Sequence, residues 1–301
     1  MEKAGFFEKQ FKLSENQTNV RTEVLAGITT FMTMAYILIV NPIILSDAGM
    51  DFGAVFTATA VASLIGILIM AFYANLPFAL APGMGLNAFF AYTVVLGMGY
   101  SWQMALTAVL IEGIIFIILT FLNVREAIIN AIPMSLKKAV SVGIGLFIAL
   151  IGLANANVIV PGQGVIVSIG NIKSGDALLA LIGLLITGIL LARKVKGALF
   201  IGILITTVIG FPLGITKLPE SIISLPPSLA PTFVKFDFSN IFSLDMLVVI
   251  FTFLFVDLFD TVGTLVGVST KANMIGEDGK LPRAKQALFA DAVGTTVGAV
   301  L

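Results

Sequence analysis

The chain has 301 residues, 58% apolar and 11% charged, with 17 basic and 17 acidic side chains that leave no net charge. A soluble domain carries about 25% charged residues, so this composition and a mean hydropathy of +1.07 exclude a soluble globular protein and indicate an all-α polytopic membrane protein. The lack of Cys and His excludes disulfides and thiolate catalysis and removes the commonest metal ligand, while the balanced charge argues against a nucleic-acid partner.

The N-terminal segment, residues 1–21, places Phe6, Phe7 and Phe11 among charged side chains. This pattern predicts a short helix that lies in the membrane interface. Nine apolar stretches follow, each close to the length of about 20 residues that crosses a bilayer. They are residues 22–45, 52–74, 79–97, 101–122, 136–154, 176–192, 196–213, 243–268 and 285–301.

Positive charge alternates between the segments that join these stretches. Most Lys and Arg residues, among them Lys3, Arg125 and Lys280, lie in the N-terminal segment and in every second loop after it. Because cytoplasmic loops carry an excess of Lys and Arg, the sequence predicts a cytoplasmic N-terminus.

The longest loop, residues 214–242, contains four prolines and is predicted to be an external loop between two halves. Seven predicted spans precede it, and an odd number of spans inverts any copy that follows. We therefore expect inverted seven-helix repeats, the second of which begins at residue 243 and is truncated within an apolar run at Leu301.

The eighth predicted span carries two acidic residues, Asp257 and Asp260. A spacing of three places both carboxylates on one helical face. Acids inside a span are costly to insert and usually functional, and two close carboxylates in a low dielectric are suited to binding a proton. The alternative is that one Asp bonds a neighbouring helix. The pair favours a proton-coupled binding site.

The third predicted span is interrupted, because Pro77 and Pro82 keep the residues between them from being helical. The sequence predicts an extended piece through Ala81, followed by a half-helix that Pro82 opens and that continues to about Gly97. Gly83 lies at its start and Asn87 about one turn into it. Such interruptions mark transporter binding sites. The alternative is a plain proline kink with glycines for helix packing.

Other intramembrane candidates are weaker. Glu112 serves either helix contact or coupling, whereas a capping or interfacial role is expected for Asp291 near the inner end of the last span. Two glycine pairs have the small-xxx-small spacing that lets helices approach closely. They are Gly263 with Gly267, and Gly294 with Gly298.

Three separated motifs together resemble the adenine, guanine and hypoxanthine permeases, a branch of the nucleobase/cation symporter superfamily that also contains uracil, xanthine and ascorbate carriers. They are residues 80–90 (LAPGMGLNAFF), residues 21–31 (RTEVLAGITTF) with Asn41-Pro42, and residues 257–264 (DLFDTVGT). The resemblance covers essentially the whole chain.

The resemblance implies two inverted repeats of seven spans, divided into a core domain that carries substrate and a gate domain that forms a homodimer. Residues 22–134 and 243–301 would then be core and residues 135–213 gate. It further implies that short strands in the third and tenth spans meet at the site, and that a Glu beyond Leu301 completes it.

The resemblance also implies the roles of single residues. Asn87 and Asp257 would contact the purine, with Ala81 and Gly83 also in the binding site, and Asp260 would shape the site or share proton handling with Asp257.

We therefore predict a secondary active transporter of the plasma membrane that takes up purine nucleobases with protons, without a metal or organic cofactor. The alternative is an anion carrier of similar architecture, of the sulfate or bicarbonate type, which two central acids disfavour. An intramembrane aspartyl protease would carry its acids on two helices, whereas here both share one, so no enzyme activity is expected. A channel would pass currents far faster than carrier turnover.

Overall fold

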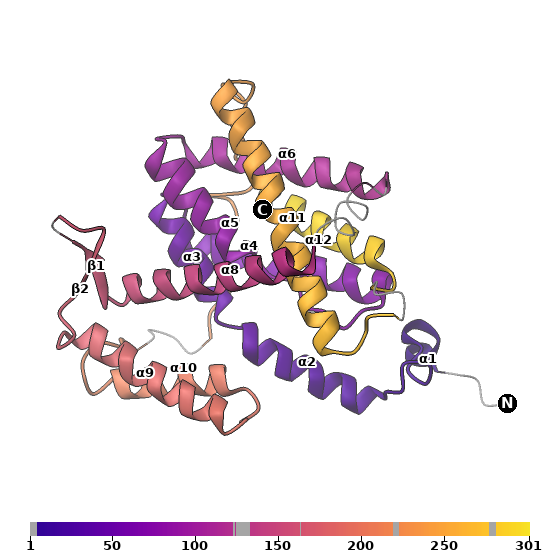
Figure 1. The fold of residues 1–301 in the computed structure, drawn as a ribbon, viewed down its shortest axis with the longest axis horizontal. Helices are drawn as coiled ribbons and strands as arrows, with labels where there is room; N and C mark the ends of the chain where they lie inside the picture. The colour runs from indigo at the N-terminus through magenta and orange to yellow at the C-terminus, as the bar shows by residue number, and fades with distance from the viewer. Residues whose placement is uncertain (1–4, 123, 125–132, 163, 219–222, 277–280) are drawn as a thin grey trace. The chain divides into compact units, whose positions relative to one another are not determined.

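The computed structural model describes residues 5–122, 124, 133–162, 164–218, 223–276 and 281–301, and these residues form a predominantly helical fold (Figure 1). Lys3, Arg125 and Lys280, used to predict orientation, lie outside them. The chain divides into two compact units. The first contains Met1–Val20, Ile37–Ile144 and Pro226–Leu301, and the second contains Arg21–Tyr36 and Gly145–Leu225.

The first unit contains segments from both the N-terminal and the C-terminal parts of the chain. Its elements are α1 (Phe6–Phe11), α3 (Ile37–Asp47), α4 (Phe52–Ile69) with its π-helical continuation η1 (Met70–Ala74), α5 (Met84–Ala88) with its π-helical continuation η2 (Phe89–Gly97), α6 (Trp102–Phe121), α11 (Leu244–Lys271) and α12 (Ala284–Val300). Helix α12 packs against α4, η1 and α6, while α11 packs against α6 and α5. Their buried apolar side chains form one core that includes Met70, Phe116, Leu258, Val262 and Leu288.

The second unit contains a helical hairpin. Its elements are α2 (Val20–Met34), the end of α8 (Met134–Asn155), the strands β1 (Ile159–Pro161) and β2 (Val167–Ile169), α9 (Gly175–Ala192) and α10 (Ala198–Gly210). The strands pair antiparallel, with Val160 opposite Ser168. Helices α9 and α10 run antiparallel, because Gly183 faces Thr206 and Thr187 faces Gly202.

Local sequence signals explain where the long helices of the first unit begin. The side chain of Asp51 accepts a hydrogen bond from Ala54 N at 2.8 Å at the start of α4. Ser101 does the same for α6 and Ser243 for α11, each accepting from the backbone N–H three residues later at 3.3 Å. Each cap satisfies one N–H group that the helix cannot pair internally.

Small residues allow α12 to approach its neighbours closely. A Cβ atom added to Gly66 of α4 would lie 3.7 Å from the Cα atom of Gly294, and one added to Gly298 would lie 3.7 Å from Ala62. Gly294 and Gly298 therefore act as the small-xxx-small spacing predicts. A Cβ added to Gly267 would meet nothing within 4 Å, so the other glycine pair does not form a similar contact there.

The loop after Leu225 is packed against the first unit. Thr57 donates a hydrogen bond to Pro227 O at 2.9 Å, and Thr107 Oγ1 accepts one from Asp237 N at 2.9 Å. At the far end of α12, Val300 O accepts from Val234 N at 2.8 Å, and Leu301 O accepts from the Thr232 hydroxyl at 2.8 Å. This part of the predicted loop therefore joins three helix ends, while residues 214–218 and 223–225 group with the second unit.

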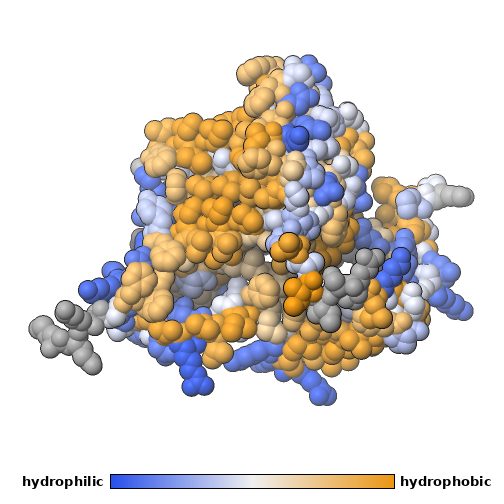
Figure 2. All heavy atoms as spheres, turned by 180° about the vertical axis from the view of Figure 1, so that it is seen from behind, coloured by the Kyte–Doolittle hydropathy of each residue, from blue (hydrophilic) through white to orange (hydrophobic). Residues whose placement is uncertain are grey.

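Among the described residues, five helical stretches are long and apolar enough to cross a membrane: Val20–Asp47, Phe52–Ala74, Trp102–Phe121, Gly175–Ala192 and Leu244–Lys271. Figure 2 shows apolar residues over broad areas of the face that it presents. The first stretch differs from the single predicted span. A turn at Ala35–Tyr36 divides it into α2 and α3, which belong to different units.

The close crossing of α6 and α12 provides a test of the fold. A Cβ on Gly113 of α6 would lie 2.5 Å from Thr296 Oγ1 and 3.2 Å from the Thr296 Cα atom on α12. We expect Gly113→Ala to reduce the free energy of unfolding by about 1–3 kcal/mol through overpacking. Thermal unfolding in detergent would measure this, with Gly267→Ala on α11 as a control that should change stability little. Equal stability of the two variants would contradict the crossing.

Candidate functional site

The interrupted third span is observed, with two differences from the prediction. Asn75 ends η1 in a left-handed conformation, with φ 50°, and backbone that is neither helix nor strand then runs to Gly83. Helix α5 begins at Met84, so Pro82 precedes the helix and does not form its first turn. No strand is assigned to this segment, and among the described residues the two-stranded sheet is β1–β2. The pairing of a short strand here with one of the tenth span stays a prediction.

Helix α11 runs antiparallel beside the broken span. A Cβ on Gly83 would lie 2.7 Å from Asp260 Oδ2, so the carboxylate rests against the start of α5. Further along, the rings of Phe89 and Phe253 meet edge to face, with centroids 5.0 Å apart. These two contacts bracket the turn of α11 that carries Asp257, which is 5% exposed. That turn therefore runs alongside the part of α5 that carries Asn87, which is half-buried.

The position of Asp260 changes how the start of α5 is interpreted. The first N–H groups of a helix have no partner within the helix and can bind an anion or a ligand. The structure places a protein carboxylate there, where the positive end of the helix dipole favours negative charge. Asp260 therefore lies against the first residue before the half-helix.

A third acidic residue joins the pair through Thr261. The Thr261 hydroxyl donates a hydrogen bond to Asp291 Oδ2 of α12 at 2.9 Å and lies 3.5 Å from Asp257 Oδ1. One hydroxyl proton serves one acceptor, so the shorter contact is the stronger bond. The expected capping role of Asp291 is not what the structure shows, because this residue lies in the middle of α12. Asp291 lies within the last predicted apolar stretch, and an acid in such a stretch was the signal that could have predicted a polar contact with another helix.

The Asn87 amide contacts a residue that sequence reasoning quoted in a motif without a role. Asn87 Nδ2 donates a hydrogen bond to Asn41 Oδ1 of α3. Asn41 Nδ2 in turn donates to Thr59 Oγ1 of α4 at 2.8 Å. The side chain of Asn87 is therefore held by buried Asn41, which is itself held by buried Thr59.

Two other candidates are Ala81 and Glu112. Ala81 is exposed on the non-helical segment before α5, where its neighbours Pro82 and Gly83 are half-buried. Glu112 is 1% exposed and sits in α6 beside Gly113. Within the described residues, no three acidic side chains gather closely enough to hold a metal ion.

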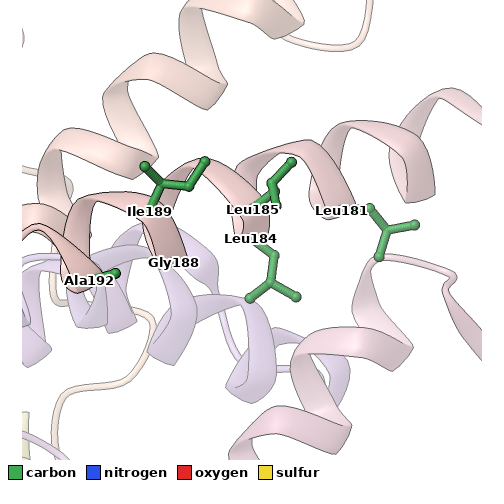
Figure 3. Close-up of a pocket in the computed structure, with 6 residues that line it drawn as sticks. All are labelled: Leu181, Leu184, Leu185, Gly188, Ile189 and Ala192. Carbon is green, nitrogen blue, oxygen red and sulfur yellow. The ribbon is translucent and has the colours of Figure 1, made fainter.

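A shallow groove in the second unit is unsuited to a polar ligand. It follows one face of α9 and is lined by apolar side chains and a glycine (Figure 3). These residues are Leu181, Leu184, Leu185, Gly188, Ile189 and Ala192. Such a surface suits acyl chains or another apolar helix and offers no side-chain hydrogen-bond donor or acceptor.

Comparison with known proteins agrees with the motifs. A family model described as the permease family matches residues 21–301. The chain belongs to this family. It is 46% identical over 297 residues to the adenine permease AdeP of Escherichia coli, covering 99% of this chain and 66% of that protein. It is 51% identical over 302 residues to the guanine/hypoxanthine permease PbuG of Bacillus subtilis, covering 97% and 68%.

A relative from Methanocaldococcus jannaschii is 54% identical over 296 residues, covering 98% of this chain and 68% of that protein. The chain thus spans about two thirds of the length of these relatives. The family predicted from the three motifs is confirmed. Together with the apolar helices, membership identifies a multi-pass membrane protein.

The contact between Gly83 and Asp260 can be tested directly. We expect Gly83→Ala to displace the Asp260 carboxylate or the start of α5, because an added methyl group would meet Oδ2 at 2.7 Å. Uptake of radiolabelled adenine or hypoxanthine should fall by about tenfold or more, with the protein still inserted in the membrane. Gly85→Ala is the matched control, since a Cβ there would meet nothing within 4 Å. Similar uptake by both variants would contradict a functional contact.

Proposed function

We propose that this protein is a secondary active transporter for the uptake of purine nucleobases. The observation that carries the proposal is the antiparallel pairing of an acid-bearing helix, α11, with a broken span that presents Asn87, in a chain of the permease family. The names of AdeP and PbuG, adenine permease and guanine/hypoxanthine permease, support a purine as substrate.

The chemistry of these side chains fits a purine. A nucleobase is a flat, neutral ring system with N–H donors and ring-nitrogen acceptors along its edge. A carboxylate at Asp257 accepts from the donors, the amide of Asn87 offers a donor and an acceptor, and the paired rings of Phe89 and Phe253 supply an apolar wall. Asp260 would support the site by ordering the start of α5.

Further features of the proposal come from the resemblance. Asp257 and Asp260 would couple uptake to protons, and the core domain would move against a gate domain that forms the homodimer. The N-terminus would be cytoplasmic and the protein would reside in the plasma membrane, with two inverted repeats in the whole transporter. The exposed apolar face of α9 is compatible with a gate helix that meets a second copy.

The acidic pair also separates this proposal from its alternatives. An anion carrier would need positive charge near the substrate, whereas carboxylates lie beside α5. The named relatives are permeases, which are transporters and not enzymes.

Replacing Asp257 tests the substrate assignment. Asp257→Asn should lower purine uptake by roughly ten- to hundredfold, because a hydrogen bond to a charged group is lost while the shape is kept. The assay is uptake of radiolabelled hypoxanthine in cells without their own purine permeases. Asp245→Asn, in the exposed first turn of the same helix, should behave like the wild type. Unchanged uptake in Asp257→Asn would sink the assignment.

Proton coupling has its own test. In proteoliposomes, an inward proton gradient should drive accumulation of hypoxanthine, and a protonophore should abolish it. A sodium gradient at equal internal and external pH should have no effect. Accumulation that follows the sodium gradient alone would replace the proton with sodium as the coupling ion.

A further inference from the structure

The amide of Asn87 is the end of a hydrogen-bond chain that links α5, α3 and α4. Asn87 Nδ2 donates to Asn41 Oδ1, and Asn41 Nδ2 donates to Thr59 Oγ1 at 2.8 Å. The Thr59 hydroxyl donates to the backbone carbonyl of Val55, one turn earlier in α4, at 2.7 Å. Asn41 and Thr59 are 4% and 3% exposed, so this chain lies inside the first unit.

The direction of this chain is set at the Val55 carbonyl. A carbonyl oxygen only accepts, so the single Thr59 proton is used there and the Thr59 oxygen must accept from its other neighbour. That neighbour, Asn41, therefore turns its NH2 group toward Thr59 and its oxygen toward Asn87. Asn87 must then direct its NH2 group at Asn41. The opposite arrangement would place two acceptor oxygens, Thr59 Oγ1 and Val55 O, 2.7 Å apart without a proton between them.

We propose that Asn41 and Thr59 are positioning residues that determine which end of the Asn87 amide is presented to the substrate. With one N–H of its NH2 group bound to Asn41, Asn87 holds its Oδ1 atom at a fixed point as an acceptor and keeps one further N–H as a donor. It therefore selects ligands that present an N–H group at that point. This inference rests on the proposed function, since it assigns a specificity role to residues behind the same site.

A fixed amide matters because its two ends are similar in shape and opposite in hydrogen bonding. An amide that can turn over accepts an N–H group or a ring nitrogen with little distinction. A site built to bond a particular N–H group rejects an analogue that lacks it, because a buried polar group is then left unpaired. Burial of Asn41 and Thr59 keeps water from replacing their bonds.

The experiment compares how strongly hypoxanthine and a set of its N-methyl derivatives compete for uptake of radiolabelled hypoxanthine. Each derivative blocks one ring N–H group. In the wild type, at least one derivative should bind about tenfold or more weakly than hypoxanthine. Thr59→Val keeps the side-chain shape but removes the hydroxyl, and it should reduce that preference by about tenfold. Thr59→Ser should retain the preference.

The matched control is Ser63→Ala. Ser63 lies one turn further along α4, and its buried hydroxyl has no hydrogen-bond partner within the described residues. The preference should be that of the wild type. A rescue tests the direction of the chain: adding Asn41→Asp to Thr59→Val supplies a carboxylate that accepts from Asn87 Nδ2 without help from Thr59, so the preference should return.

The outcomes separate the two proposals. A wild-type protein that does not take up hypoxanthine overturns the proposed function. A wild type that takes it up, with the same preference in Thr59→Val and Ser63→Ala, overturns the positioning role alone. Equal loss of affinity for hypoxanthine and all derivatives in Thr59→Val shows a merely structural chain and also overturns it. Thr59→Ala provides the same comparison if Thr59→Val does not reach the membrane.

Discussion

The first unit depends on one constraint: backbone polar groups cannot remain unpaired inside a bilayer. Two prolines prevent a helix between Asn75 and Gly83, so this segment is tolerated only where protein surrounds it or water reaches it. Helices α11 and α12 pack around it, and Leu76 and Phe78 of the segment belong to their common core. The non-helical segment therefore requires helices around it. It also leaves a region between these helices that no regular helix fills.

The polar residues around the non-helical segment form two hydrogen-bonded groups. Asp257, Thr261 and Asp291 join α11 to α12, and Asn87, Asn41 and Thr59 join α5 to α3 and α4. Buried polar networks are costly unless their members are satisfied. Here each network reaches a predicted binding residue, Asp257 in one case and Asn87 in the other, so their cost is consistent with use at a site.

Much of this arrangement is predictable from the chain, and the exceptions have physical reasons. Hydropathy located the helices because a bilayer imposes their length, and the prolines located the non-helical segment. Hydropathy could not show that Ala35–Tyr36 divides the first apolar stretch, because it measures polarity and not backbone continuity. The spacing of Asp257 and Asp260 predicted a shared face, but contacts across helices, such as Thr261 with Asp291, depend on packing that no local pattern encodes.

The loop that begins at Pro226 ties the second turns of α4 and α6 to the last turn of α12 through four hydrogen bonds. These helices are therefore braced at their ends as well as packed along their lengths. A molecule bound between α5 and α11 would therefore move together with these helices. Any movement of α4, α6 and α12 relative to one another would first have to break the hydrogen bonds that the loop makes to them.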